Sequence, residues 1–249
     1  MTRATCAMCR NPRQLTKEHI WPAGFLRRSD YEIRYSARAK RTFGGDLTIK
    51  DVCGECNNGP LSRLDAYACE LYDRYFAKMP RRSEVVTFEY DFGRLTRWLL
   101  KIAFNSARSN GSPDIDLLQP YAPVILAEVP CLPVFVGFFV ALIGPSLMMN
   151  STTGTTKVIQ PQAARSGPII IPDVTGYEHV STRMVMVNGY FFTLVLSRQT
   201  TLASTEVPDL FARIPGQPLA LGGRMRLTTT LDAAQVLGGI RDWPRTRMR

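Results

Sequence analysis

Apolar residues recur at helical spacing in two segments of the first half of the chain. The first segment follows Asn58-Gly59-Pro60, and the second runs from about Phe92 to Ser109. Recurrence every three or four residues indicates one buried helical face, and Pro suits a first helical turn. We predict one helix that starts near Asn58 and ends before Pro80, and a second that ends at the turn 110–113. The apolar positions are Leu61, Leu64, Ala68, Leu71 and Tyr75 in the first helix, and Leu95, Trp98, Leu99, Ile102, Ala103 and Ala107 in the second.

The second half of the chain changes to runs rich in β-branched and aromatic residues, a composition that predicts strands. Asn188-Gly189, between two such runs, predicts a tight hairpin turn. The stretch 131–149 carries no charge but is interrupted by Pro133, Gly137 and Gly144-Pro145, so we interpret it as buried strands rather than a membrane span. The predicted strands are 134–143, 155–159, 169–171, 184–187 and 190–196, and the tail after residue 233 is predicted to hold a short helix and a basic end.

These patterns predict an α+β protein of two parts. Residues 1–82 combine short strands, a long basic loop and one helix, whereas residues 83–249 combine helices with an antiparallel sheet in a mixed α/β domain. A length of 249 residues is sufficient for two modest domains, each with its own core. No motif in 83–249 assigns it a role, so target recognition and oligomerisation as a homodimer both stay open.

The net charge of +10 is concentrated in the first part of the chain. Residues 1–82 hold 16 Lys/Arg and 9 Asp/Glu, a balance of +7, and the remainder adds only +3. A basic face favours a polyanionic partner, most simply nucleic acid, although a basic protein that is merely soluble is the alternative. Guanidinium and ammonium groups bind phosphate oxygens, and the candidates, each of which could instead be a solvated charge, are Arg27, Arg28, Lys40, Arg41 and Arg63.

Two CxxC pairs lie within the first part, Cys6–Cys9 and Cys53–Cys56. Each pair offers two sulfurs to one face of a tetrahedral ion, so the four residues predict a zinc site. Zinc would stabilise a segment too short and polar to form a good core alone. The other two cysteines, Cys69 and Cys131, are interpreted as small apolar core residues. Thiolate ligands fit a reducing compartment, and no apolar run follows the N-terminus, so we expect a cytoplasmic protein.

The dipeptide Glu18-His19 lies between the two cysteine pairs and is a candidate for chemistry. Adjacent residues on a strand point to opposite faces, which indicates separate tasks. The carboxylate would hold a hard divalent ion such as Mg²⁺, and the imidazole would take a proton from water. Asn57, directly after the last cysteine, would supply an amide oxygen as a further ligand.

Each of these residues also has a purely structural alternative. His19 could cap a strand, Glu18 could be a solvated surface charge, and Asn57 could cap the following helix. Asn58 competes with Asn57 for either role. The second Glu-His pair, Glu178-His179, has no cysteines or predicted helix start nearby, and we interpret it as loop or strand surface.

The stretches LTKEHIWPAGF (15–25) and VCGECNNGPLSRLD (52–65) resemble the HNH, or ββα-metal (His-Me finger), endonucleases. The similarity is to the branch stapled by zinc on four cysteines, which includes phage junction-resolving enzymes and bacterial HNH-type proteins. It implies an N-terminal ββα-metal module, treble-clef-like, in residues 1–82. It further implies that the four cysteines hold a structural zinc, that His19 is the general base, and that Glu18 and Asn57 bind a catalytic Mg²⁺ or Mn²⁺.

The sequence departs from the family pattern at two points. The family's middle Asn, which braces the active-site loop, has no counterpart before Cys53, and the local polar stand-ins are Asp46, Thr48 and Asp51. The last motif position is Asn57 rather than His, which favours Mg²⁺ or Mn²⁺ over an imidazole-rich site. The loop from His19 to Cys53 is also long, which leaves its register open.

The sequence therefore leads to three functional hypotheses. The first is a metal-dependent HNH endonuclease that hydrolyses phosphodiester bonds in DNA. The second is a zinc-dependent nucleic-acid-binding module that no longer cleaves its target. The absence of the middle Asn would then reflect the loss of activity. The third is an RNA-cleaving toxin of the same fold.

Overall fold

The fold is described from a computed structural model of the chain. The structure describes residues 4–28, 34–36, 41–43, 47–128, 136–149, 152–161, 164–169, 180–197, 210 and 212–233, and for 34–36 and 41–43 the backbone alone. Predictions for Lys40, Asp46, Cys131, the pair Glu178-His179 and the C-terminal tail fall outside these residues.

The first part of the chain is built around a small antiparallel hairpin and a helix. Strand β1 (Leu15–His19) pairs with β4 (Thr48–Cys53), with His19 opposite Thr48 and Leu15 opposite Cys53. The chain then turns directly into a helical run. The run comprises α2 (Gly54–Cys56), the π-helical segment η1 (Asn57–Leu61), α3 (Ser62–Leu71) and the π-helical segment η2 (Tyr72–Phe76). Three short elements lie between β1 and β4 in the sequence: α1 (Ala23–Leu26), β2 (Arg34–Ser36) and β3 (Arg41–Phe43).

The first helix begins at Gly54, four residues before the predicted start at Asn58. Cys53 is extended, with φ −73° and ψ 158°, whereas Cys56 already lies in the helix. The second cysteine pair is thus itself the turn from strand to helix. The signal at Gly59-Pro60 marks a kink instead, because Gly59 has the non-helical angles φ −99° and ψ −105°.

Helix α4 (Phe92–Asn110) confirms the second predicted helix. Asp91 caps its start by accepting a hydrogen bond from the backbone N–H of Arg94 at 2.8 Å, a favourable use of Asp. Gly111 ends it in the left-handed region, at φ 61°, where glycine carries no Cβ penalty. The predicted apolar face is buried, but so are polar side chains on the remaining faces, so α4 is a central helix rather than a surface one.

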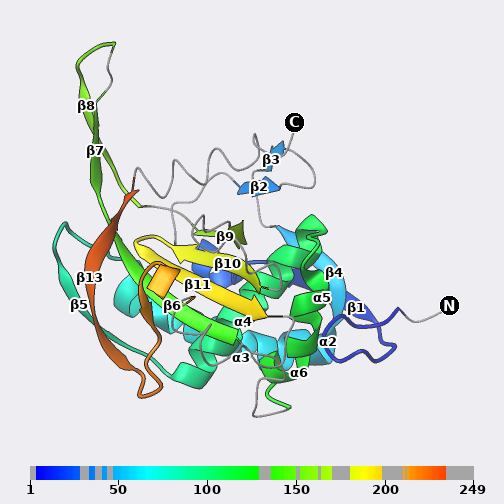
Figure 1. Cartoon of the computed structure of the whole chain (residues 1–249). Helices are drawn as coiled ribbons and strands as arrows, with labels where there is room; N and C mark the ends of the chain where they lie inside the picture. The colour runs from blue at the N-terminus through cyan, green and yellow to red at the C-terminus, as the bar shows by residue number, and fades with distance from the viewer. Residues whose placement is uncertain are drawn as a thin grey trace.

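A seven-stranded sheet forms most of the second part, with strand order β5-β13-β6-β11-β10-β9 and with β12 paired to β6. Its pairs are antiparallel except β13 with β6, which run parallel. Helix α4 packs against β9 and β10, behind the sheet in Figure 1. The strands are β5 (Val85–Glu89), β6 (Val136–Gly144), β9 (Ala164–Ile169), β10 (Val180–Val187), β11 (Tyr190–Ser197), β12 (Gln217–Pro218) and β13 (Arg224–Asp232).

The sheet matches the sequence prediction in its centre and not at its edges. Three of the five predicted runs correspond to β6, β10 and β11, and Asn188-Gly189 forms the two-residue turn between the last two. The run predicted at 155–159 forms a strand of a separate hairpin. Of the run predicted at 169–171, Ile169 is the last described residue of β9, and residues 170–171 lie outside the described part of the chain. Strands β5 and β13 were not predicted. The sequence of β13 is polar and half-exposed, whereas that of β5, VVTFE, is rich in β-branched residues and carried a strand signal that was missed.

The remaining elements lie at two ends of the sheet. Three short helical segments follow α4, namely α5 (Ile115–Leu118), η3 (Gln119–Tyr121) and α6 (Ala122–Ile125). Of these, α5 and α6 pack on α4. Strands β7 (Ser146–Met149) and β8 (Thr156–Ile159) form a hairpin that extends away from the rest of the molecule (Figure 1). Among the described residues, no helix is long and apolar enough to cross a membrane.

One hydrophobic cluster contains side chains from both predicted parts of the chain. Trp98 of α4 lies within ring-contact distance of Phe25 and Phe76, with centroids 6.4 Å and 6.5 Å away. Phe76 in turn contacts Tyr190 of β11 at 4.9 Å. The first 82 residues and the sheet therefore share a core, and α4 lies between them.

We predict that Gly189→Ala destabilises the protein by about 1–3 kcal/mol, the typical cost of forcing an extra carbon into a packed site. A Cβ at this position would lie 2.4 Å from Cδ of Pro80, a rigid ring that cannot turn aside. Urea denaturation measures the change. Gly167→Ala in β9 is the matched control, because its Cβ would meet nothing within 4 Å. Equal stability of the two variants would contradict this packing.

Candidate functional site

Cys6, Cys9, Cys53 and Cys56 come together in space, as their spacing predicted. Their sulfur atoms all lie within 4.8 Å of one another, and the Cys9–Cys53 Sγ separation is 3.8 Å. In a tetrahedral site with Zn–S bonds of about 2.3 Å the sulfurs lie about 3.8 Å apart. The four cysteines are free thiols rather than disulfides. The cluster could therefore hold a metal ion such as zinc.

Backbone hydrogen bonds favour the thiolate form of one cysteine in this cluster, Cys6. The N–H of Cys53 donates to Sγ of Cys6 at 3.3 Å. Burial raises the pKa of the Cys6 thiol, but N–H groups of Cys53, Cys9 and Met8 outweigh it and lower the pKa to about 7. Burial and the neighbouring sulfurs raise the pKa of Cys56. A bound cation would offset this cost, because metal ligation requires the deprotonated form.

Glu18 is buried, with 2% of its surface exposed, so it is not a solvated surface charge. Its Oε1 accepts from Nζ of Lys101 at 2.8 Å and from Nδ2 of Asn105 at 3.2 Å. Both partners come from α4, in the second part of the chain. The carboxylate beside His19 is therefore held from outside the β1–β4 hairpin.

Lys101 is fully buried and contacts two carboxylates, those of Glu18 and Asp65. Burial alone would lower the pKa of this ammonium, but the charges of Asp65 and Glu18 raise it above its ordinary value. Asp65 lies on α3 with about a quarter of its side chain exposed (23%). Burial raises the pKa of the Asp65 carboxyl, and the charge of Lys101 offsets only part of that rise.

Two further polar residues of α4 extend this arrangement to β4. Asn105 also donates Nδ2 to the backbone carbonyl of His19 at 3.1 Å, and its Oδ1 accepts from Nη2 of Arg108 at 2.5 Å. Arg108 pairs through Nη1 with Oδ1 of Asp51 at 2.6 Å. We call the residues Glu18, Asp51, Asp65, Lys101, Asn105 and Arg108 the α4 polar network.

Asn57 lies against β1, although 40 residues separate it from Lys17 in sequence. Its Nδ2 donates to Oγ1 of Thr16 at 3.0 Å and to the carbonyl of Lys17 at 2.9 Å. It does not cap the helix, because no side-chain cap bond is present at that start. Asn58 is exposed. The structure thus brings Asn57 to the strand that carries Glu18 and His19.

Of the predicted phosphate-binding residues, the structure describes the side chains of Arg27, Arg28 and Arg63. Arg27 and Arg63 are exposed, but Arg28 donates Nε to Oδ1 of Asp73 at 2.8 Å and Nη1 to the carbonyl of Gly24 at 2.9 Å. Arg41 lies on β3, where its side chain is not described. Their role in binding nucleic acid stays a prediction.

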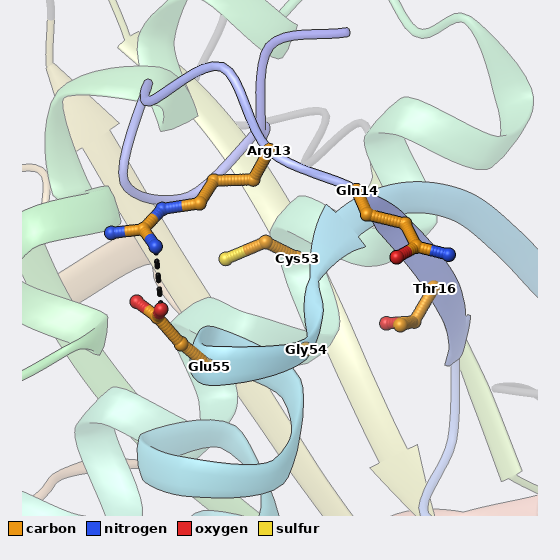
Figure 2. A pocket seen from close by; sticks show the side chains of 6 residues that line it. All are labelled: Arg13, Gln14, Thr16, Cys53, Gly54 and Glu55. Carbon is orange, nitrogen blue, oxygen red and sulfur yellow. Dashed lines mark hydrogen bonds and ion pairs between the residues drawn. The ribbon is translucent and has the colours of Figure 1, made fainter. Parts of the chain in front are cut away.

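A shallow pocket of about 410 Å³ opens beside the second cysteine pair. Figure 2 shows its lining, in which Arg13 and Glu55 form an ion pair at 2.5 Å across the opening. Thr16, which accepts from Asn57, lines the same pocket. The volume is at the lower end of the range for ligand pockets.

The sequence predicted the cysteine cluster, which the structure confirms, and named Glu18 and Asn57 as candidates, but it did not predict the contacts of Glu18 with α4. A signal was present. Lys101, Asn105 and Arg108 recur at i, i+4 and i+7 inside an otherwise apolar helix, a spacing that places them on one face. Three polar residues on one face of a central helix indicate a buried network, but the sequence does not name their partners.

Comparisons of the chain with protein-family models, with curated proteins and with solved structures found no match. The function must accordingly be argued from the site itself.

We predict that the purified protein contains about one zinc ion per chain and that its removal by a chelator lowers the melting temperature. Cys6→Ser should lose the ion, because a hydroxyl is a poor replacement for a thiolate ligand. Elemental analysis and thermal unfolding measure both effects. Cys69→Ser, outside the cluster, serves as the matched control and should keep the zinc. A Cys6→Ser protein with full zinc content and unchanged melting would contradict this assignment.

We predict that Lys101→Met lowers the free energy of unfolding by about 3–5 kcal/mol, because it leaves the buried carboxylate of Glu18 and the partly buried one of Asp65 without their counter-ion. Arg94→Met, on the exposed side of α4, removes a surface charge and should cost less than about 1 kcal/mol. Chemical denaturation of the zinc-loaded proteins compares them. Similar stabilities for the two variants would show that the ion pair is not a major constraint.

Proposed function

We propose that the chain is a metal-dependent endonuclease of the HNH type that hydrolyses phosphodiester bonds in DNA. The observation that carries the proposal is the contact of Asn57 with the backbone of Lys17, immediately before Glu18 and His19. An antiparallel hairpin, the helix that follows it and the four-cysteine cluster surround these three residues. Residues 1–82 would then be a ββα-metal nuclease module.

Zinc in the four-cysteine cluster would be structural. Four thiolates complete a tetrahedral coordination shell and leave no position for water or substrate. The cluster fixes the turn from β4 into α2, and Asn57 is the residue directly after its last ligand. Zinc binding would therefore control where Asn57 lies.

Glu18 and Asn57 fit a hard divalent ion such as Mg²⁺ or Mn²⁺, which prefers oxygen ligands. Nδ2 of Asn57 donates both of its hydrogen bonds to β1, so the amide oxygen Oδ1 would face away from the strand. The contacts described for Glu18 use Oε1, so Oε2 would be the ligand. Asp65 adds a second carboxylate beside the single ammonium of Lys101, and the resulting excess of negative charge favours a cation.

His19 would act as the general base, taking a proton from the attacking water as its oxygen bonds to phosphorus. The bond from phosphorus to the 3′ oxygen then breaks, leaving a 5′ phosphate and a 3′ hydroxyl that takes its proton from solvent. When bound, the divalent ion supplies charge stabilisation to the leaving 3′ oxygen. Asn105 holds the backbone carbonyl of His19 during this step.

DNA binding would rely on exposed cations of residues 1–82. Arg27 and Arg63 have exposed side chains, and contacts to phosphate position a backbone without reading its sequence. Lys17 and Lys50 are exposed on β1 and β4, each two residues from the paired residues His19 and Thr48. Their positive charge is consistent with a polyanionic substrate.

A second candidate function is a nucleic-acid-binding module without cleavage. The observation that favours it is the ion pair of Glu18 with Lys101, since an ammonium already neutralises the carboxylate that would bind the metal. Cleavage of RNA by the same chemistry is a further alternative, because nothing in the residues around His19 selects deoxyribose over ribose.

The nuclease proposal predicts that the protein nicks or linearises supercoiled plasmid with Mg²⁺ or Mn²⁺ and that chelator abolishes this. His19→Ala should lower the rate by about 10²–10⁴-fold, the usual contribution of a general base. His179→Ala, which removes the other histidine of the chain, is the matched control and should cleave as the wild type does.

Three outcomes distinguish the alternatives. Intact plasmid with cleavage of an RNA substrate that depends on His19 supports the ribonuclease. Intact substrates of both kinds, with nucleic-acid affinity retained in chelator, support the binding module. Equal loss of cleavage in both histidine variants would contradict His19 as the base.

A further inference from the structure

The polar face of α4 is buried against the predicted nuclease module. Lys101 and Asn105 are both 0% exposed, and Arg108 is 8% exposed. Their contacts reach β1 through Glu18 and His19, and β4 through Asp51. A helix outside residues 1–82 thus forms hydrogen bonds with the two residues proposed for chemistry.

The orientation of the Asn105 amide is determined by its neighbours. Arg108 has donors and no acceptor, so the atom facing it must be the carbonyl oxygen of Asn105. Nδ2 must then face Glu18 and His19, where a carboxylate oxygen and a carbonyl oxygen both accept. Arg108 is in turn ion-paired with Asp51. The amide of Asn105 therefore has one orientation in which its oxygen faces a donor and its nitrogen faces acceptors.

Lys101 and Asn105 act on the same oxygen of Glu18 from consecutive turns of α4. Lys101 attracts the carboxylate but imposes little direction, because an ammonium is a compact point charge. The Asn105 donor adds direction, since hydrogen bonds weaken steeply as they bend. Together they fix which oxygen of Glu18 faces α4 and which faces away.

We propose that Asn105, supported by Lys101 and Arg108, is a positioning residue that presents Glu18 to the divalent ion and holds His19 beside it. This rests on the proposed function, and it assigns part of the segment 83–249 to the active site. Residues that hydrogen-bond to metal ligands typically contribute about 10–100-fold in metal affinity or activity.

The test uses Asn105→Ala and Asn105→Ser in the full-length, zinc-loaded protein. The serine variant keeps a hydroxyl near Arg108 but is too short to bridge Glu18 and His19. Ser106→Ala is the matched control, because Ser106 is a buried polar neighbour on α4 that bonds to the carbonyl of Ser166 in the sheet, at 2.9 Å. Zinc content and melting temperature show whether each variant is folded.

Metal binding and steady-state kinetics are both measured. Mn²⁺ affinity is determined by electron paramagnetic resonance, with Glu18→Gln to identify binding at this site, and kcat and KM are determined on plasmid. Both Asn105 variants should weaken Mn²⁺ binding about tenfold and lower kcat about tenfold or more, with KM for DNA within about twofold. Ser106→Ala should match the wild type.

Folded Asn105 variants with wild-type Mn²⁺ affinity and kcat would overturn the proposal. Equal losses in Ser106→Ala, or loss of zinc and folding in both Asn105 variants, would also overturn it by making the role purely structural. If the wild type binds Mn²⁺ at Glu18 but cleaves nothing, the nuclease proposal fails, and the Mn²⁺ affinities still decide the role of Asn105. If the wild-type protein binds no Mn²⁺ at Glu18, the positioning role of Asn105 is overturned. The plasmid-cleavage assay then decides the nuclease proposal by itself.

Discussion

The ion pair between Lys101 and Glu18 is the constraint on which the arrangement of the two parts of the chain depends. A fully buried ammonium is costly unless carboxylates compensate it, and here the carboxylates come from β1 and α3, while the ammonium comes from α4. The pair is satisfied only when these three elements meet in one register. The aromatic contacts of Trp98 with Phe25 and Phe76 then fill the space around it with non-directional packing.

Strand β1 is held from two sides, and this explains how a short, half-polar hairpin can carry an ordered site. On one side, the four cysteines fix the start of the helix and Asn57 bonds to Thr16 and Lys17. On the other, Asn105 bonds to Glu18 and to the carbonyl of His19. Metal binding would stabilise the first contact and burial of α4 stabilises the second. The proposed active site lies where the two constraints meet.

The parts of the fold that could be predicted from sequence are those governed by local chemistry. The CxxC spacing predicted the cysteine cluster, the apolar period predicted α4, and Asn188-Gly189 predicted the turn between β10 and β11. The start of the first helix was wrong by four residues, because Cys53-Gly54-Glu55-Cys56 forms the turn into the helix and Pro60 follows only a kink.

What could not be predicted depends on contacts between distant segments. Nothing near Lys101 in the sequence indicates that its partners are Glu18 and Asp65, and nothing in the polar sequence of β13 indicates that it pairs with β5 and β6. The residues considered as replacements for the family's middle Asn, Asp46, Thr48 and Asp51, all lie shortly before Cys53 in the sequence. The side chain that bonds to the backbone of His19 is instead Asn105, 86 residues away. The predicted nuclease role of Glu18, His19 and Asn57 itself stays a proposal.

The central claim is that the chain holds two different metal ions at two sites. Anomalous diffraction from crystals of the zinc-loaded protein soaked in Mn²⁺, recorded at the absorption edges of both metals, tests it most directly. We expect a zinc peak among Cys6, Cys9, Cys53 and Cys56 and a manganese peak beside Glu18 and Asn57. A zinc peak alone, with the ion pair of Glu18 and Lys101 intact and no manganese beside it, would contradict the claim and leave a zinc-stabilised binding protein.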